Sequence, residues 1–311
     1  MATAHSTPPS AAPVPAPMGA RVNRWLESLT RQLERTPVLS AAGKAITKPV
    51  AKLVKAGPVK DLLSGTWLGH PAHPLLTDIP IGAWSSAVFL DLTELAGGAN
   101  GATRHGSDTL VGLGVLAALP TAASGLSDLS DEYDDQMMAA GGAHALSSLA
   151  ATGLFAASYI ARRRGKRGQG IALSLIGTGL LTAAGFLGGH LSYRKGLGVD
   201  HTVFEEPIGD WTAALTADEL PGGKPQCVSV GGRDIMLYRA NDTIYALANR
   251  CTHRGGPLHE GEIDGQDVIC PWHQSRFHIP DGSVTRGPAV APQASYETRV
   301  REGKIEVRSK A

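Results

Sequence analysis

Residues 249–275 read NRCTHRGGPLHEGEIDGQDVICPWHQS and decide how the C-terminal part of the chain folds. The stretch holds two short motifs, Cys251-Thr-His253 and Cys270-Pro-Trp-His273, with sixteen residues between them. Each motif supplies one thiolate and one imidazole, which are common ligands of zinc and iron. Two hypotheses follow. One is a tetrahedral Cys2His2 zinc site, and the other is a [2Fe–2S] cluster in which two Cys hold one iron and two His hold the other.

The residues around the ligands favour the cluster. Gly255, Gly256 and Pro257 suit a tight loop whose backbone N–H groups point at sulfur atoms, because glycine has no Cβ to block the approach. In both loops the stretch resembles the Rieske family. Short β-branched and apolar runs on either side predict an all-β domain over residues 203–308. The resemblance implies a [2Fe–2S] cluster that transfers single electrons, held by the four ligands.

Two departures from the high-potential branch of that family predict a low reduction potential. That branch has an extra cysteine in each cluster loop, and these form a disulfide, whereas this chain has Trp272 and the region of Pro257 there. It also has a tyrosine that donates to a ligand sulfur, where this chain has Phe277; the second donor, Ser275, is kept. Fewer donors leave more electron density on the cluster. We expect Ser275 and Phe277 to tune a ferredoxin-type centre.

Long apolar segments fill the middle of the chain. Three of them contain no Asp, Glu, Lys or Arg, and each is close to the ~20 residues that span a bilayer as a helix. A fourth is interrupted by acidic residues but keeps an apolar run. The four segments are 75–95, 109–127, 136–161 and 170–193. They predict a membrane α-helical bundle of four spans over residues 66–200, and the alternative is a soluble bundle of buried helices.

A second resemblance supports the membrane bundle. The stretches GHPAHPLLTDIPIGAW (69–84) and GFLGGHLSYRKGLGVD (185–200) are similar to the opening and closing signatures of a bacterial four-helix membrane family of unknown function. That family occurs alone or fused to Rieske domains. The resemblance implies this topology and this fusion, but no mechanism.

The N-terminal part divides into two segments. Residues 1–20 are rich in alanine and proline and are expected to be a disordered tail. Residues 21–65 carry nine Lys/Arg against three acidic residues, with apolar residues at helical spacing. Basic amphipathic helices of this kind lie on anionic membrane surfaces, and a solvated linker is the alternative.

Four histidines are candidates for a membrane redox site. With four spans, His70, His73, His144 and His190 fall on the side of the membrane that carries the Rieske domain, together with Asp78. Ionisable side chains at such depth are costly and mark functional sites. They could bind haem, another metal or a quinone, or they could only link helices by hydrogen bonds.

The basic residues give conflicting predictions of membrane orientation. The run from Arg162 to Arg167 places the loop between the third and fourth spans in the cytoplasm, whereas the basic segment 21–65 places the Rieske domain there. We favour an integral protein of a bacterial cell membrane with a cytoplasmic Rieske domain.

The functional prediction is a membrane-anchored electron carrier. The chain has no flavin or dinucleotide motif and too little sequence for an oxygenase iron domain, so electrons must come from or go to a partner protein, a reductase or an oxidase. A lipid membrane is the second partner, and nucleic acid is not expected. The alternative function is a redox-sensing or structural membrane anchor without quinone-linked turnover.

Overall fold

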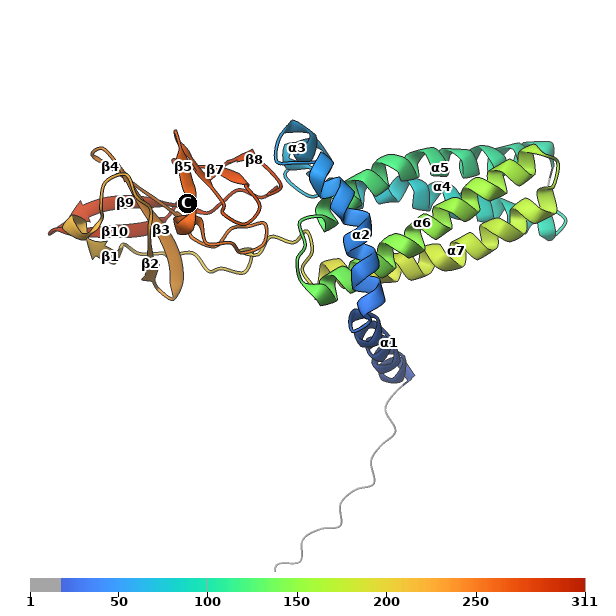
Figure 1. Cartoon of the computed structure of the whole chain (residues 1–311), viewed down its shortest axis with the longest axis horizontal. Helices are drawn as coiled ribbons and strands as arrows, with labels where there is room; N and C mark the ends of the chain where they lie inside the picture. The colour runs from blue at the N-terminus through green and yellow to red at the C-terminus, as the bar shows by residue number, and fades with distance from the viewer. Residues whose placement is uncertain (1–17, 99, 311) are drawn as a thin grey trace, which may run out of the picture.

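The computed structural model describes residues 18–98 and 100–310, and it places a β domain at one end of a helical bundle (Figure 1). The expected disordered tail lies outside these residues, except for its last three, which begin helix α1 (Met18–Glu34).

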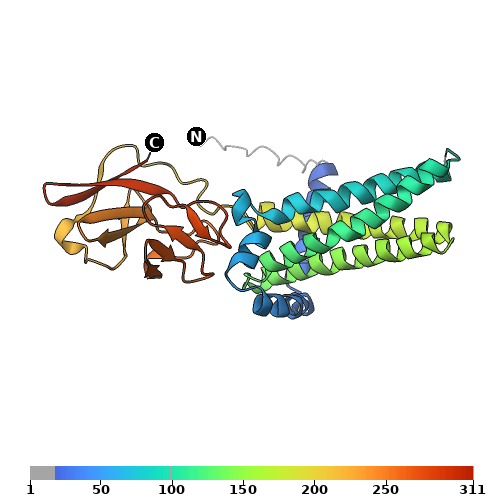
Figure 2. The same cartoon turned by 90° about the horizontal axis from the view of Figure 1, so that it is seen from above.

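Four long helices form the bundle: α4 (Ala72–Leu95), α5 (Gly101–Leu129), α6 (Asp135–Arg163) and α7 (Arg167–Gly189). They run up and down, and α7 continues into a π-helical turn, His190–Arg194. Asn100 caps α5 and Asp134 caps α6, each by accepting a backbone N–H of the first turn. Because of the up-and-down order, the start of α4, the α5–α6 loop and the end of α7 lie at the end nearest the β domain (Figure 2).

The predicted count of four membrane spans is wrong by one helix. Of the described helices, three are long and apolar enough to cross a bilayer: α4, α5 and residues 167–194. α6 coincides with the expected span 136–161, but alanine, glycine and serine make up about half of it, and such small side chains add little hydropathy. α6 is instead the helix on which α1, α2, α5 and α7 all pack. The fold class, an apolar helical bundle beside an all-β domain, is confirmed.

Helix α2 (Pro37–Leu53) crosses α6 at close range (Figure 1). A Cβ on Gly43 of α2 would lie 2.6 Å from the Met138 carbonyl oxygen, and a Cβ on Gly142 of α6 would collide with the Leu39 carbonyl oxygen. Glycine at both positions therefore permits the crossing, as small residues do between membrane helices. Helix α3 (Pro58–Ser64) and the 3-10 turn η1 (Thr66–Leu68) then connect α2 to α4.

The β domain consists of two antiparallel sheets. One has the order β1 (Thr212–Thr216), β10 (Lys304–Ser309), β9 (Ser295–Arg301), β4 (Thr243–Ala248), β3 (Arg233–Ala240) and β2 (Gln226–Val230). The other has the order β5 (Glu262–Asp264), β6 (Asp267–Ile269), β7 (Arg276–His278) and β8 (Val284–Arg286). Glu302 and Gly303 both have positive φ, 52° and 74°, which suits the two-residue turn between β9 and β10.

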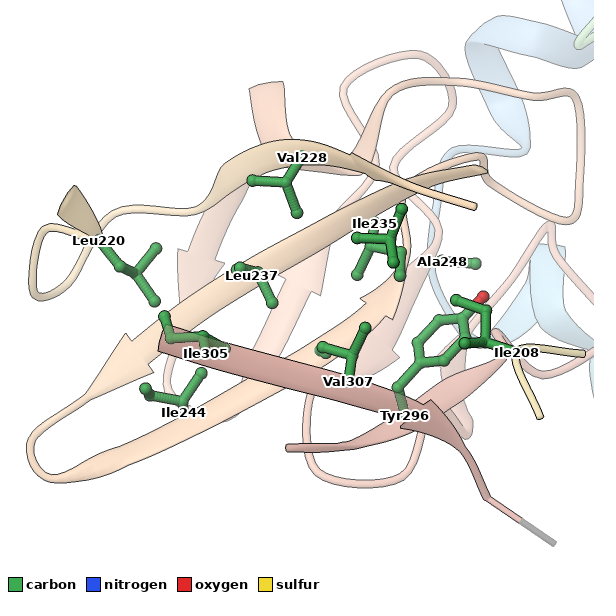
Figure 3. Close-up of a cluster of buried hydrophobic side chains, with 12 residues drawn as sticks. Ile208, Leu220, Val228, Ile235, Leu237, Ile244, Ala248, Tyr296, Ile305 and Val307 are labelled. Atoms are coloured by element: carbon green, nitrogen blue, oxygen red, sulfur yellow. The ribbon is translucent and has the colours of Figure 1, made fainter. Parts of the chain in front are cut away.

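Two apolar cores hold the domain together. In the first, Ile235 and Leu237 of β3 pack with Ile305 and Val307 of β10 (Figure 3). The second contains Phe277 of β7 and the two cysteines of the cluster loops. Burial of an aliphatic or aromatic side chain of this size contributes about 1.5–3 kcal/mol. The second core thereby fixes the loops that carry the predicted ligands.

Candidate metal centre

Two loops at the bundle-facing end of the β domain carry the predicted ligands. The first follows β4 and is closed by hydrogen bonds from Cys251 N–H to Gly256 O (2.9 Å) and from Gly255 N–H to Cys251 O (2.8 Å). Gly255 has φ +76°, which glycine adopts without strain. The second loop joins β6 to β7 and is closed by Cys270 N–H donating to Ser275 O at 2.8 Å.

The two cysteine thiols contact each other and are each 1% exposed. Backbone N–H groups two and three residues after each cysteine donate to its sulfur. The hydrogen bond with Cys270 raises the pKa of the Cys251 thiol well above its usual range, and the same bond lowers the pKa of Cys270 to about 7. A Cβ on Gly256 would lie 2.8 Å from the Cys270 sulfur. The space beside the thiols therefore requires glycine.

The two imidazoles also contact each other. The ring centroids of His253 and His273 are 4.9 Å apart, with planes at 86°. Nδ1 of His253 and Nε2 of His273 are buried without a hydrogen-bond partner among the described residues. Burial lowers the pKa of both imidazoles, that of His253 to about 3. Both rings are therefore neutral at pH 7, which is the form that binds a metal.

The grouping of the ligands favours two irons over one zinc. Within residues 18–98 and 100–310, no group of three or more His, Cys, Asp or Glu side chains gathers around one ion position. A structural zinc needs four such ligands around one ion. A thiol pair and an imidazole pair suit a cluster in which each pair holds its own iron. The four residues therefore fit a [2Fe–2S] cluster.

The two residues predicted to tune the cluster are fully buried beside it. Phe277 packs in the core that contains both cysteines and brings no hydroxyl group. The Ser275 hydroxyl oxygen accepts a hydrogen bond from Ala289 N–H at 2.9 Å. All three cysteines are free thiols, and Cys227 lies on β2, so no disulfide links the cluster loops. The tuning role of Ser275 and Phe277 stays a prediction.

The α5–α6 loop of the bundle contacts the two imidazoles that are predicted to be ligands. The Tyr133 ring stacks on His273 with centroids 5.5 Å apart and planes at 11°. Asp131 Oδ2 lies 3.9 Å from His253 Nε2 and 2.8 Å from the ammonium group of Lys60. Lys60 is itself buried and donates to the Ser127 carbonyl oxygen at 2.6 Å. The face of the cluster site that carries the imidazoles therefore meets the helical domain.

Further contacts hold the two domains together. Arg254 forms an ion pair with Glu132, and both side chains are largely buried. Asp61 of α3 accepts a hydrogen bond from Gly287 N–H at 2.8 Å, and the Thr66 hydroxyl donates to Ala289 O at 3.2 Å. A cavity of about 180 Å³ lies between the domains, and its lining includes His70, Asp128 and His253.

The four candidate histidines of the bundle do not form one group. His73 and His144 face each other with ring centroids 6.3 Å apart. His190 Nε2 instead contacts Glu34 of α1 at 2.7 Å. His70 is exposed and contacts its neighbour, the Pro71 carbonyl oxygen, at 3.1 Å. Asp78 is exposed on α4. The structure therefore brings together one pair and separates the others from it.

Sequence analysis missed the bundle residues at this contact. Asp131 and Tyr133 contact the predicted imidazole ligands, and Lys60 and Glu132 form ion pairs with Asp131 and Arg254 beside them. The one available signal was the acidic run DLSDEYDD at residues 128–135, placed between two apolar segments. Such a run is ordinarily a solvated loop. In the structure its acidic residues Asp131 and Glu132 contact His253 and Arg254 of the β domain.

Comparison with known proteins covers both parts of the chain. Residues 210–297 match the Rieske [2Fe–2S] domain family, and residues 69–201 match a predicted membrane protein family, DUF2231. Ferredoxin CarAc of Metapseudomonas resinovorans is 32% identical over 98 residues, which are 31% of this chain and 92% of that protein. The ferredoxin component of the naphthalene 1,2-dioxygenase/salicylate 5-hydroxylase systems of a Ralstonia species is 30% identical over 96 residues, which are 31% of this chain and 92% of that protein.

One similar solved structure is the ferredoxin of carbazole 1,9a-dioxygenase from Nocardioides aromaticivorans. It is 31% identical, with a TM-score of 0.31, and the match covers 33% of this chain and 100% of that chain. The sequence relatives match the β domain over nearly their whole length, and they are electron-transfer components. The chain therefore belongs to the Rieske [2Fe–2S] family, and it carries its Rieske domain on a membrane-type helical domain of the DUF2231 family.

Proposed function

We propose that this protein is a membrane-anchored Rieske ferredoxin that relays single electrons between a redox partner protein and a site in the membrane domain. The observation that carries the proposal is the contact between the ligand imidazoles and the α5–α6 loop. Tyr133 stacks on His273, and Asp131 lies beside His253. The imidazole side of the cluster site thereby faces the helices.

The residues of the site have separate tasks in this proposal. A bound [2Fe–2S] cluster supplies a one-electron donor and acceptor. Cys251 and Cys270 would hold it on the side of the β-domain core, and the imidazoles would hold it on the side of the helices. Backbone N–H groups at both sulfurs stabilise the negative charge that reduction adds. Tyr133 and Asp131 cover one side of the imidazoles, and a surface pocket lined by Tyr133, Trp272 and His273 lies beside them.

The relatives suggest the class of partner. Both are ferredoxins, and one is the ferredoxin component of naphthalene 1,2-dioxygenase/salicylate 5-hydroxylase systems. We propose that this chain likewise exchanges electrons with a partner protein, a reductase or an oxidase, and that its second redox partner lies in the membrane. A quinone or a haem is the candidate there.

Large apolar side chains on the outer surface of the bundle support a lipid surrounding. Phe89 of α4 is 66% exposed, Leu116 of α5 is 67% exposed and Ile176 of α7 is 59% exposed. In water each such side chain would forgo about 1.5–3 kcal/mol of burial free energy. Val22, Trp25 and Leu29 form an exposed stripe on the basic helix α1, which suits a helix lying on the membrane surface.

Ion pairs in the bundle weaken the argument for a Rieske domain outside the cell. Two arginines of the basic run already form ion pairs inside the bundle. Arg162 of α6 pairs with Asp91, and Arg167 of α7 pairs with Glu94. Asp108 contacts both arginines. Arg163, Arg164 and Lys166 remain exposed at that end. Segment 21–65, at the Rieske end, has nine basic residues, and seven of them remain when Lys44 and Lys60, which pair with Asp135 and Asp131, are set aside. We propose a cytoplasmic Rieske domain.

Reconstitution separates the electron carrier from a sensor or structural anchor. The full chain is placed in liposomes with or without a membrane quinone, the cluster is reduced, and its paramagnetic resonance signal is followed. The proposed relay predicts that the signal of the reduced cluster decays faster when quinone is present. A decay that is slow and independent of quinone, in protein that also lacks haem, would favour the sensor or anchor.

A further inference from the structure

Two histidines face each other across the helical bundle. His73 lies at the start of α4 and His144 lies in α6, helices that are diagonal in the bundle. Their ring centroids are 6.3 Å apart and the ring planes are perpendicular, at 85°. We propose that His73 and His144 bind the iron of a haem between them. This inference rests on the proposed function only for the role of the haem, which would be the electron acceptor in the membrane. Whether haem binds to the pair can be tested without that function.

Each ring is fixed by a neighbouring helix in the same way. His73 Nδ1 lies 3.0 Å from the Thr121 carbonyl oxygen of α5, and His144 Nδ1 lies 2.9 Å from the Ala184 carbonyl oxygen of α7. Because a carbonyl oxygen only accepts, each Nδ1 carries the hydrogen and each Nε2 keeps a free lone pair. Metal-binding histidines commonly donate their second ring N–H to a carbonyl in this manner.

A glycine lies against each ring, four residues after the carbonyl that fixes it. A Cβ on Gly125 of α5 would lie 2.5 Å from His73 Cε1, and a Cβ on Gly188 of α7 would lie 3.2 Å from His144 Cε1. The α4–α5 and α6–α7 hairpins therefore present the same arrangement of histidine, carbonyl and glycine. Because the two histidine rings face each other, the two hairpins could bind one ligand from opposite sides.

The spacing and the number of ligands favour haem over a bare ion. Two iron–nitrogen bonds of ~2.0 Å, with roughly 1.1 Å from each nitrogen to its ring centre, place the centroids about 6 Å apart. Among the residues that the structure describes, no third His, Cys, Asp or Glu side chain completes a metal site with the pair. A bare zinc ion needs three or four protein ligands, whereas haem iron needs only axial ones.

The pair lies at the end of the bundle that meets the Rieske domain. Gly125 precedes the last residue of α5, Leu129, by four positions, which is about 6 Å along a helix axis. The loop that follows α5 carries Asp131 and Tyr133, which contact the cluster ligands. A haem bound by His73 and His144 would therefore sit close beneath the iron–sulfur centre.

Optical and paramagnetic resonance spectra of the full-length protein test the proposal. The protein is purified in detergent, as isolated and after titration with hemin, and haem is counted by its pyridine complex. We expect one haem per chain with low-spin bands, and a strongly anisotropic ferric signal because the imidazole planes are perpendicular. His73→Ala and His144→Ala should each lose these bands, whereas the conservative His144→Met should shift them.

The matched control is His105→Ala, which changes an exposed histidine of α5 at the far end of the bundle. It should keep full haem binding, and all variants should keep the Rieske signal, which shows that they fold. Wild-type protein that takes up no hemin would overturn the proposal. So would haem bands that persist in both alanine variants, or a bare metal at the pair without haem. None of these results would alter the assignment of the iron–sulfur carrier.

Discussion

Glu132→Gln tests how the Rieske domain is held on the helical domain. Glu132 Oε1 accepts the backbone N–H groups of Tyr133 and Asp134, each at 3.1 Å, and its Oε2 pairs with Arg254. Glutamine keeps the shape and the acceptor for both backbone groups. The substitution therefore removes the charge that faces Arg254 and places an amide NH2 donor in front of its guanidinium.

The magnitude follows from the burial of the pair. The Glu132 side chain is 6% exposed and that of Arg254 is 14% exposed, so loss of the carboxylate leaves a guanidinium with little water to replace it. Truncating one partner of such a pair costs 2–5 kcal/mol. Because glutamine keeps the two backbone hydrogen bonds of Glu132, we take about 2–3 kcal/mol, which shifts the docking equilibrium roughly 30- to 150-fold towards the undocked state.

Hydrogen exchange of the Gly287 amide is the readout. This N–H donates to Asp61 of the helical domain and lies outside the substituted ion pair, so it exchanges when the domains separate. We expect its exchange to accelerate by the same roughly 30- to 150-fold. Amides of β3, such as that of Leu237, report on the β domain alone and should not change.

Glu260→Gln is the matched control, because it removes the same charge from an exposed site of the Rieske domain. Equal exchange at Gly287 in wild type and Glu132→Gln would refute the reasoning, since the ion pair would then not hold the docked state. Acceleration of the Leu237 amide as well would show that the substitution unfolds the domain instead of releasing it.

Three further predictions concern the Rieske domain. His273→Ala and Cys251→Ala should each abolish the Rieske paramagnetic resonance signal, and a normal signal in either would disprove the ligand assignment. The wild-type midpoint potential should lie low in the Rieske range, toward about −150 mV, and Phe277→Tyr should raise it by adding a donor near a sulfur; redox titration measures both. Hydrogen bonds from the Ser283 backbone and hydroxyl lower the pKa of Asp281 to about 2 from 3.8, so its stabilisation is complete above about pH 4 and is lost as the pH falls toward 2. Asp281→Asn should flatten this dependence in urea unfolding, and an unchanged slope would contradict it.

Much of the Rieske domain could be predicted because its determinants are local in the sequence. The ligand motifs, the glycines beside them and the two-residue turn at Glu302-Gly303 all act within a few residues. The long apolar segments with few or no charged residues likewise located the four bundle helices. The lack of charge could not distinguish a membrane span from a helix of small residues. α6 has no Asp, Glu, Lys or Arg over residues 136–161, but its small side chains pack against α2, α5 and α7.

The contacts between domains could not be predicted, because they join residues far apart in the chain. Arg254 and Glu132 are 122 positions apart, and Gly287 and Asp61 are 226 apart. Helix parity placed four histidines on one side of the membrane, but rotation about each helix axis decides which of them meet. The structure pairs His73 with His144 and directs His190 to Glu34 of α1, a helix whose crossing no periodicity specifies.

The paramagnetic resonance spectrum of alkali-washed cell membranes tests the central claim most directly. Alkali removes proteins bound only to the membrane surface, so a Rieske signal that remains belongs to a protein inserted in the bilayer. Cells that produce the wild-type chain should keep the signal in the washed membranes, and cells that produce Cys251→Ala should show none. A Rieske signal found entirely in the wash, or none at all in wild-type cells, would contradict a membrane-anchored Rieske electron carrier.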